Sequence, residues 1–344
     1  MGGRFQMMKP DASVAQQAPP VLVEVWRGPM VESRHRGSLA VVAASGEVRA
    51  ALGDIGRKVF MRSMAKPIQA LPLIESGAAD RYGLTDTELA AMCGSLNGED
   101  FQARVVAGIL RRAGLAENSL LCGIQRPSHR PTARRLDAAK EPVSALRHNC
   151  AGKHAAMLLL CVHHGWPLED YPAASHPVQR LMLSRVADFC SVPPAEVAVG
   201  TDGCGVPVFG VPLGGIALAY ARLAGASRPA VARLVAACLA HPEMIGGEGR
   251  ICTDAMRAAP GVLAKTGAEG GYALALTRQG LGVALKVDDG APRAVQSCVA
   301  EILDNLGLLD DDGRLALARY RNPEVRNFRG EVVGEIRPLL RAIM

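Results

Sequence analysis

The order of apolar and polar residues predicts strands at the start of the chain and a helix after them. Residues 21–26 and 38–43 are β-branched or alternate with polar residues, and with 47–52 they predict strands. The turn residues Ser45-Gly46 predict a hairpin between the second and third of these. From Met64 to Ser76 the spacing becomes helical, and Gly77 predicts the end of that helix.

Helices dominate the middle of the chain, and strands return towards its end. Helical spacing recurs in residues 86–93, 100–113, 151–164, 178–189, 213–223, 229–239 and 250–258. Short apolar runs then predict strands at 262–265, 272–277, 281–287 and near 331–336, with a helix at 294–306. Because strands lie at both ends, we predict an α+β fold whose terminal strands pair in one antiparallel sheet.

This pattern also predicts how the chain is divided. Residues 1–20 are polar and end in two prolines, which predicts a disordered tail. The remainder, 21–344, is expected to be one domain. Its sheet lobe would comprise 21–62 and 260–344, and its helical lobe 63–259.

Composition and charge are those of an ordinary globular protein. Apolar residues make up 49% and charged residues 21% of the chain. The 39 basic and 33 acidic residues give a net charge of +6 without a long basic tract, so we expect no nucleic-acid binding. A signal-peptide pattern and a bilayer-length apolar segment are both lacking, so we expect a cytoplasmic protein without membrane contact. The nine cysteines are an odd number, which favours reduced thiols over a disulfide framework.

The first chemical signal is Ser63-x-x-Lys66 at the start of the predicted helix. A spacing of three places both side chains on one helix face. A serine hydroxyl needs a base to become a nucleophile, and a buried lysine is such a base when neutral. Alone, however, the pattern is more typical of a serine that caps a helix.

Two further motifs favour catalysis. Ser95-x-Asn97 follows a predicted helix, and Lys265-Thr266-Gly267 lies on a predicted strand. Together with Ser63 they stand in the order found in penicillin-recognising serine enzymes. The order of three motifs on suitable elements is far more specific than any one of them.

Each residue of this set has a separable predicted role. Ser63 attacks, Lys66 accepts its proton, and Ser95 relays a proton to the leaving group. Lys265 supplies a second positive charge at the strand edge. The backbone N–H groups of Ser63 and Ala268 would form the oxyanion hole.

Over about residues 21–340 the chain resembles the bacterial asparaginase II family, the thermolabile rhizobial-type asparaginases. The resemblance rests on Glu32-Ser33-x-His35-x-Gly37, Gly53-Asp54, Arg62-Ser63-x-x-Lys66-Pro67, Ser95-x-Asn97-Gly98-Glu99, Asn149-Cys150-x-Gly152-Lys153-His154, Asp202-Gly203-Cys204-Gly205-x-Pro207 and Lys265-x-Gly267-Ala268-Glu269-Gly270. It implies a serine-β-lactamase/glutaminase-like fold, a homodimer, and hydrolysis of L-asparagine to L-aspartate and ammonia.

The resemblance also implies which residues form the site. The catalytic residues would be Ser63, Lys66, Ser95 and Lys265, and a metal site, typically of zinc, would comprise Cys150, Lys153, Asp202 and Cys204. We expect substrate contacts from Glu32, His35, Arg62, Asn97, Asp202, Gly267 and Ala268; for His35, a structural role at the hairpin end is the alternative. Leu96 and Gln125 stand where the family commonly has histidines.

Read without the family, the cysteine cluster leaves three interpretations open. Cys150, Lys153 and His154 share a helix face, and Asp202 and Cys204 flank a glycine turn. The cluster is either a zinc site that orients the substrate, or a reduced cysteine pair whose lysine and aspartate contact the substrate directly. In the third interpretation Cys150 is itself the nucleophile, with His154 as its base.

The sequence therefore predicts an L-asparaginase that acts on a small amide amino acid through a serine nucleophile. A glutaminase or another small-amide hydrolase is the nearest alternative. A cytoplasmic β-lactamase-like serine hydrolase, or a protein that only binds a metal or an amino acid, are the more distant ones.

Overall fold

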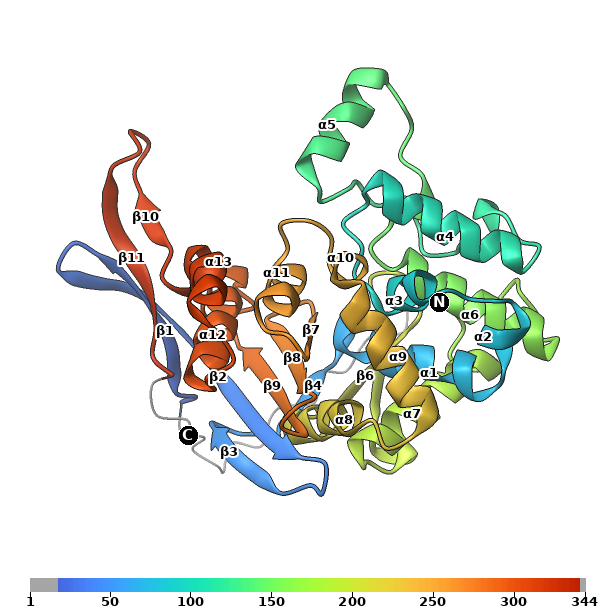
Figure 1. The fold of residues 1–344 in the computed structure, drawn as a ribbon, viewed down its shortest axis with the longest axis horizontal. Coiled ribbons are helices and arrows are strands. Elements are labelled where there is room, and N and C mark those ends of the chain that lie inside the picture. The colour runs from blue at the N-terminus through green and yellow to red at the C-terminus, as the bar shows by residue number, and fades with distance from the viewer. Residues whose placement is uncertain (1–17, 341–344) are drawn as a thin grey trace, which may run out of the picture.

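Both ends of the chain contribute strands to one antiparallel sheet in the computed structural model, which describes residues 18–340 (Figure 1). The strand order is β10-β11-β1-β2-β9-β8-β7, with β3 beside β2. The strands are β1 (Val21–Arg27), β2 (Met30–Ala43), β3 (Val48–Leu52), β7 (Val262–Thr266), β8 (Gly271–Leu276), β9 (Leu281–Val287), β10 (Glu324–Arg326) and β11 (Val332–Pro338). The predicted α+β class is confirmed. Of the predicted tail, residues 1–17 lie outside the described residues.

Strand β2 joins two parts of this sheet. Residues 30–36 pair with β1, whereas residues 37–43 lie between β9 and β3. The first part, with β1, β10 and β11, forms an arm that extends from the molecule (Figure 1). The sequence pattern did not predict a strand at 30–36 because its inner face carries Val31, Ser33 and His35, which give no apolar alternation.

The centre of the sheet is covered on both faces. All six residues of β8 are buried, although neighbouring residues of a strand point to opposite faces. Two helices contact both β8 and β9, namely α8 (Leu213–Gly225) and α12 (Pro292–Asn305). Helix α8 lies within the sequence range predicted for the helical lobe, yet it packs on the sheet.

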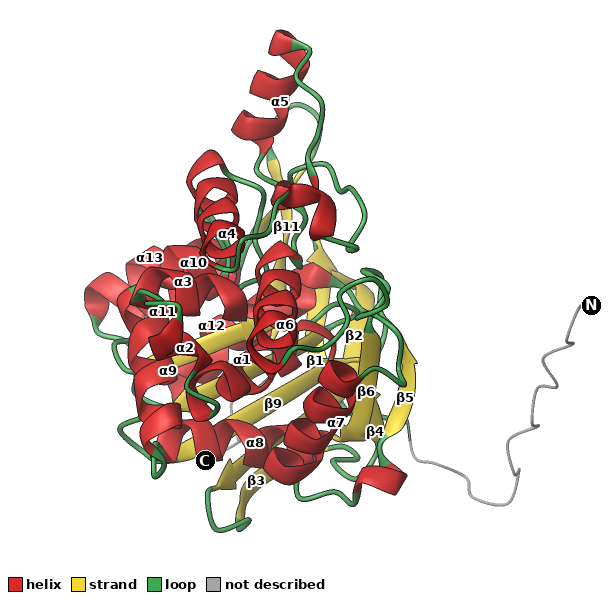
Figure 2. Ribbon diagram, turned by 90° about the vertical axis from the view of Figure 1, so that its right-hand side faces the viewer, coloured by secondary structure: helices red, strands yellow, loops and turns green. Residues whose placement is uncertain are grey.

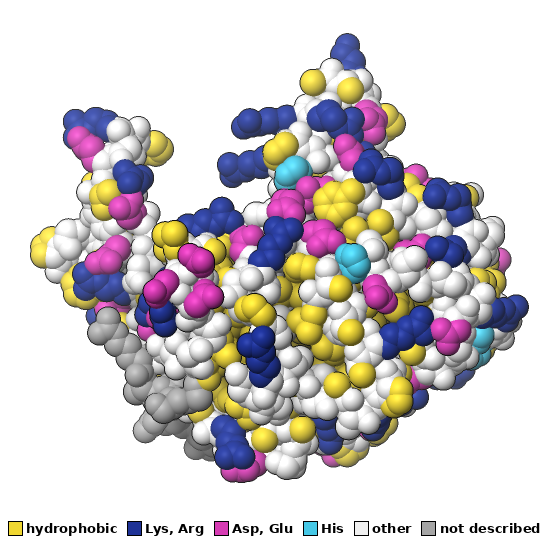
Figure 3. Space-filling view, viewed as in Figure 1, with side chains coloured by type: hydrophobic (Ala, Val, Ile, Leu, Met, Phe, Trp, Pro, Cys, Tyr) yellow, Lys and Arg dark blue, Asp and Glu magenta, His cyan; other side chains and the backbone are white. Residues whose placement is uncertain are grey.

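The helical lobe surrounds α1 (Lys66–Glu75), which contacts α3, α6, α7 and α9. Eight of the ten α1 residues, Lys66 to Leu73, are buried, as expected of a helix enclosed on all sides. The other α-helices are α2 (Ala78–Arg81), α3 (Asp86–Cys93), α4 (Asp100–Arg112), α5 (Arg130–Ala139), α6 (Ala151–His164), α7 (Pro177–Cys190), α9 (Pro229–Ala240), α10 (Pro242–Ile245), α11 (Ile251–Ala258) and α13 (Asp311–Arg321). Helix α5 projects from this lobe (Figure 2), and a hollow separates it from the arm (Figure 3).

The structure also contains elements that the sequence pattern did not predict. A small sheet has the order β4-β6-β5, formed by β4 (Lys58–Phe60), β6 (Pro207–Pro212) and β5 (Ala198–Thr201). Helices α5 and α13 were not predicted either, because few of their residues are apolar. Short 3₁₀ turns complete the described elements at Arg62–Ala65, Glu117–Ser119, Ala145–Arg147 and Pro194–Glu196.

All nine cysteines are free and buried. Across residues 18–340, no single helix has the length and apolar character needed to cross a bilayer. Helices α8 and α9 meet that criterion only when taken as a pair, and the pair is bent by 91°.

Glycine at position 282 lets α8 pack directly on β9. A Cβ atom at Gly282 would lie 1.9 Å from the carbonyl oxygen of Ala217 and 2.2 Å from the nitrogen of Ala221. Both atoms belong to the helix backbone, which cannot move locally as a flexible side chain can. The contact between helix and sheet therefore depends on the absence of a side chain here.

We predict that Gly282→Ala lowers the free energy of unfolding by about 1–3 kcal/mol or more, because α8 must move away from the sheet. Gly225→Ala, at the end of the same helix, is the control, since its Cβ would meet nothing closer than Ala44 at 3.8 Å. Urea unfolding of both variants measures the difference. Equal stability of the two would contradict direct helix–strand contact.

Candidate active site

Ser63 lies in a tight turn immediately before the central helix. The 3₁₀ turn Arg62–Ala65 leads directly into α1, so the serine stands at the helix start as the spacing predicts. Arg62 has φ +49°, a left-handed conformation that is costly for a residue with a side chain. Its Nε donates a hydrogen bond of 2.9 Å to Oδ1 of Asp202, which holds the turn from the β5–β6 loop.

Lys66 points into the protein, where its amine has three hydrogen-bond partners. Its side chain is 1% exposed. Nζ donates to the carbonyl oxygen of Gly94 at 2.8 Å and to that of Asn149 at 2.9 Å. The third partner is Oγ of Ser95 at 3.2 Å, so this amine is anchored between the segment after α3 and the segment before α6.

Lys265 approaches the same serine from the sheet. It lies on β7 and is fully buried, with Nζ 2.7 Å from Oγ of Ser95 and 3.0 Å from the carbonyl oxygen of Thr266. Ser95 itself is fixed because its backbone N–H donates to the carbonyl oxygen of Ile245 at 2.8 Å. One hydroxyl therefore joins two lysines that are 199 residues apart in the sequence (265 minus 66).

Burial lowers the pKa of both lysine amines. For Lys265, burial lowers the pKa to about 7, and the positive charges of Lys66 and Arg250 act in the same direction. Two positively charged ammonium groups that are buried beside one hydroxyl repel each other, which disfavours the state in which both are protonated. One of the two amines beside Ser95 is therefore neutral near neutral pH.

A cavity of about 490 Å³ brings the serines together with the segment that follows β7. Ser63 and Ser95 line it, as do the predicted backbone contacts Gly267 and Ala268. The remaining lining residues come from the neighbouring loops and helices: Asn149, Arg250, Ile251, Thr266, Glu269, Gly270, Gly290, Pro292, Val295 and Gln296. The cavity thus lies between the helical lobe and the sheet, with the nucleophile candidate at its wall.

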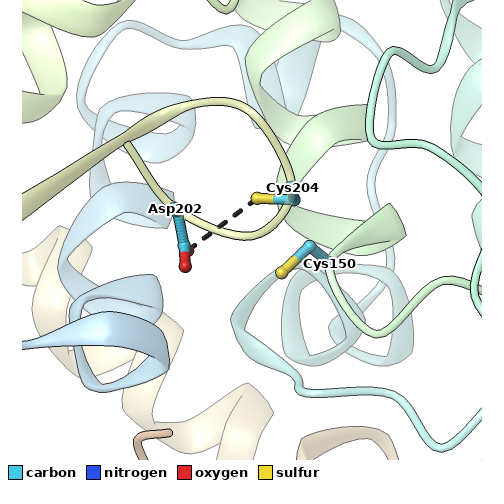
Figure 4. Close-up of side chains that lie close together, drawn as sticks. All are labelled: Cys150, Asp202 and Cys204. Atoms are coloured by element: carbon cyan, nitrogen blue, oxygen red, sulfur yellow. Dashed lines mark hydrogen bonds between the residues drawn. The ribbon is translucent and has the colours of Figure 1, made fainter. Parts of the chain in front are cut away.

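A second cluster lies behind the Ser63 turn. Cys150 stands at the start of α6, and Asp202 and Cys204 belong to the β5–β6 loop that closes on it (Figure 4). The ligand atoms of these three residues lie within 4.8 Å of one another, and Sγ of Cys204 is 3.8 Å from Oδ2 of Asp202. None of the three lines the cavity that holds Ser63.

Charges within this cluster are balanced by a buried lysine. Nζ of Lys153 lies 3.3 Å from Oδ2 of Asp202. Burial alone would lower the pKa of Lys153, but the surrounding Cys150, Cys204 and Asp202 raise it. The hydrogen bond from Cys204, together with the charges of Lys66 and Lys153, lowers the pKa of Cys150. The cluster thus combines a thiolate and a carboxylate with an ammonium group.

His154 belongs to a different contact. Its Nδ1 lies 2.6 Å from the hydroxyl of Tyr171, which accepts a hydrogen bond from the backbone N–H of Leu121. The hydrogen bond with the tyrosine hydroxyl occupies Nδ1, so that nitrogen is not free to act on Cys150. Burial lowers the pKa of His154 to about 3. The pair of Cys150 and His154 as nucleophile and base has no support in this geometry.

Comparison with known families identifies the family to which this chain belongs. The model of the family described as L-asparaginase II matches residues 23–338, nearly the whole chain. The chain belongs to the L-asparaginase II family. It is therefore an amidohydrolase, and the similarity to this family inferred from the sequence motifs is confirmed.

Solved structures similar to this asparaginase II chain are distant. Mglu in its native form has a TM-score of 0.43 and 17% identity over 80% of this chain, which spans 66% of the Mglu chain, just under two thirds. A β-lactamase from Mycobacterium bovis has a TM-score of 0.33 and 13% identity, covering 78% of this chain and 94% of that one. At these values neither structure bears on the chemistry here. Comparison with curated protein sequences gave no match.

Of the seven predicted substrate contacts, Gly267 and Ala268 line the cavity, whereas Glu32, His35, Arg62, Asn97 and Asp202 do not. Glu32 is exposed on the arm, 2.8 Å from Arg27 in an ion pair. His35 is buried between Asp289, 2.5 Å from its Nδ1, and Arg293, whose Nε donates to its Nε2 at 3.0 Å. Because Nε2 accepts, Nδ1 donates to the aspartate. His35 thereby holds the loop after β9, part of which lines the cavity.

The predicted contact Asn97 is also outside the lining. It is 2% exposed and packs beneath Gly247, where a Cβ atom would lie 2.3 Å from its amide. Its Nδ2 is 3.5 Å from the carbonyl oxygen of Glu248, and its Oδ1 has no partner among the described residues. Asn97 supports the loop that leads to Arg250.

Leu96 and Gln125, which stand where the family commonly has histidines, both bind the backbone of Asn149. The N–H of Leu96 donates to the carbonyl oxygen of Asn149 at 3.2 Å. The N–H of Asn149 donates to Oε1 of Gln125 at 3.0 Å. The carbonyl oxygen of Asn149 also anchors Lys66, so Leu96 through its backbone and Gln125 through its side chain both support Asn149 beside the lysine.

Sequence reasoning missed several residues of the site. Arg250 and Glu269 line the cavity, and the carbonyl oxygen of Gly94 binds Lys66. Glu269 stands within a quoted family motif, but no spacing rule distinguishes it from a surface residue. Arg250 begins a predicted helix and gives no signal until the chain is folded.

We predict that Lys265 titrates with a midpoint near 7. Burial beside a second amine disfavours its charged form, so it binds its proton less tightly than an exposed lysine. Carbon NMR of the lysine side chains measures this, and Lys265→Met identifies the signal by its loss. A midpoint above about 9, close to that of an ordinary lysine, would contradict the proposed pairing.

Proposed function

We propose that this protein hydrolyses the side-chain amide of L-asparagine, with Ser63 as the nucleophile. One observation carries the proposal: the hydroxyl of Ser95 joins Lys66 and Lys265 at the wall of the cavity that Ser63 lines. Membership of the L-asparaginase II family supplies the reaction class. L-Glutamine and other small amides are the alternatives that the test below separates.

The hydrogen-bond partners of the Lys66 amine favour its role as a base. A neutral amine has two N–H donors and one lone pair. The carbonyl oxygens of Gly94 and Asn149 are both acceptors only, so they take the two donors. The lone pair then faces Oγ of Ser95, and Ser63 stands three residues ahead of Lys66 at the start of the same helix.

The proposed reaction proceeds through an acyl-enzyme. Oγ of Ser63 attacks the amide carbon, and its proton passes to Lys66. The oxyanion is stabilised by the backbone N–H groups of Ser63 and Ala268. Ser95, hydrogen-bonded to Lys265, passes a proton to the nitrogen, the C–N bond breaks, and ammonia leaves. Water then attacks the ester, releases L-aspartate and restores Ser63.

We also propose that the cluster behind the Ser63 turn holds zinc. Two thiols and one carboxylate within 4.8 Å fit the ligand preferences of Zn²⁺. Lys153 would have to lose its proton to become a fourth ligand; otherwise it balances the charge of Asp202. A bound metal would tie α6 to the β5–β6 loop, and Asp202 would transmit that rigidity to Arg62.

The metal would therefore stabilise the site, while the residues above carry the reaction. Two further expectations of the sequence, a homodimer and a cytoplasmic location, stay predictions.

We predict that Ser63→Ala lowers ammonia release from L-asparagine by on the order of a thousandfold or more, because the nucleophile is removed. Ser184→Ala, an exposed serine of α7 outside the cavity, is the control. L-Glutamine and a β-lactam are assayed alongside. Undiminished ammonia release by the Ser63 variant would refute the scheme. A preference for glutamine would reassign the substrate, and a stable β-lactam adduct would indicate a penicillin-type enzyme.

We predict about one zinc ion per chain in protein purified without chelator, measured by elemental analysis. Cys150→Ala or Cys204→Ala should lose the metal, whereas Cys161→Ala, a buried cysteine outside the cluster, should keep it. Chelator should lower Tm for the parent protein, since removing a ligand of the folded state costs stability. Metal content at background level, or equal in all variants, would contradict the zinc site.

A further inference from the structure

The cavity that holds Ser63 has two charged residues in its lining, of opposite sign. Arg250 immediately precedes α11, and Glu269 lies in the turn between β7 and β8. Every other lining residue is neutral. A ligand with one negative and one positive group would match this pair of charges.

Most of the N–H donors of the Arg250 guanidinium have no partner among the described residues. The guanidinium has five N–H groups, and one donates to Oγ of Ser128 at 3.2 Å. It forms no ion pair with any carboxylate in residues 18–340. The other cations near Ser63 already have partners: Lys66 and Lys265 bind Ser95, and the charge of Arg62 is paired with Asp202.

The position of Arg250 also favours an anion. It is the N-cap residue of α11, and no side chain caps the free N–H groups of that helix end. The positive end of the helix dipole therefore adds to the charge of the guanidinium. The Arg250 charge lies near enough to the reacting amines to contribute to the lowered pKa of Lys265.

Glu269 supplies the negative charge that complements Arg250 in the cavity lining. Its carboxylate makes no hydrogen bond or ion pair with another residue of the described chain. Its backbone has φ +58°, which turns the chain at the cavity wall. A Cβ at Gly290, which also lines the cavity, would lie 3.3 Å from Oε2 of Glu269, so the glycine leaves room for this carboxylate.

We propose that Arg250 binds the α-carboxylate and Glu269 the α-ammonium group of a free amino-acid amide. A guanidinium group forms a bidentate, charge-assisted hydrogen-bond pair with a carboxylate, and a carboxylate accepts hydrogen bonds from an ammonium group. The assignment rests on the proposed function and narrows its substrate class. Asparagine within a peptide lacks both charged groups and is excluded.

The test measures binding in the Ser63→Ala chain, which cannot turn the ligand over. Calorimetry compares L-asparagine with two analogues that each lack one group. Succinamate lacks the α-ammonium group, and β-alaninamide lacks the α-carboxylate. Arg250→Gln and Glu269→Gln are each added to the Ser63→Ala chain.

Each added substitution should affect only the ligands that carry its partner group. Arg250→Gln should raise Kd about 10- to 100-fold for L-asparagine and succinamate and leave β-alaninamide unchanged. Glu269→Gln should do the same for L-asparagine and β-alaninamide and leave succinamate unchanged. Arg250→Lys, which keeps the charge without the planar fork, should give an intermediate loss.

Three controls separate recognition from structure. Arg257→Gln and Glu248→Gln break an exposed ion pair whose two residues do not line the cavity, and they should leave every Kd unchanged. Ser128→Ala removes the hydrogen bond of Arg250 but not its guanidinium, and it should also leave binding intact.

The outcomes distinguish this assignment from the proposed function. Binding of L-asparagine that survives both cavity substitutions, or an equal loss for all three ligands, overturns the assignment alone. Ammonia release that persists in the Ser63→Ala chain overturns the proposed function. Absence of L-asparagine binding to the Ser63→Ala chain overturns both.

Discussion

The hydroxyl of Ser95, held between two buried amines, is the contact on which the site depends. Burying an amine in the interior is costly unless its donors are satisfied or its proton is lost. Here one lysine comes from the central helix and the other from an edge strand of the sheet, so both lobes must be in place before the network exists. The burial of α1 from Lys66 to Leu73 and the close contact of α8 with β9 provide that rigidity.

The same short segment before α6 serves both the serine–lysine network and the cysteine cluster. The carbonyl oxygen of Asn149 anchors Lys66, and the next residue, Cys150, faces Cys204 and Asp202. Asp202 in turn holds Arg62 in its left-handed turn beside Ser63. A change at the cluster can therefore affect the site in two ways. One runs from Cys150 through Asn149 to Lys66, and the other runs from Asp202 through Arg62 to Ser63. This coupling gives the cluster a role in the site without contact with the cavity.

Much of the fold follows from local patterns. Strands that alternate or are wholly apolar, and helices with regular apolar spacing, were predicted near their observed bounds, because burial of one face leaves a periodic trace. The arm strand at 30–36, the short strands β4 to β6 and the polar helices α5 and α13 left no such trace. Most of these elements bury little, and β6, although buried, is only six residues long and has a proline at each end, so their sequences resemble loops.

For the site, the sequence by itself determined the chemical groups and their order. The spacing of Ser63 and Lys66 fixes one helix turn, and the ordered motifs single out Ser95 and Lys265. Only the tertiary structure decided that Ser95 binds both lysines, that His154 turns to Tyr171, and that Glu32 lies on the arm. It also decided that Arg250 and Glu269 share a cavity with the nucleophile. Spacing constrains neighbours along one element, whereas contacts between lobes depend on how whole elements pack, which no local pattern encodes.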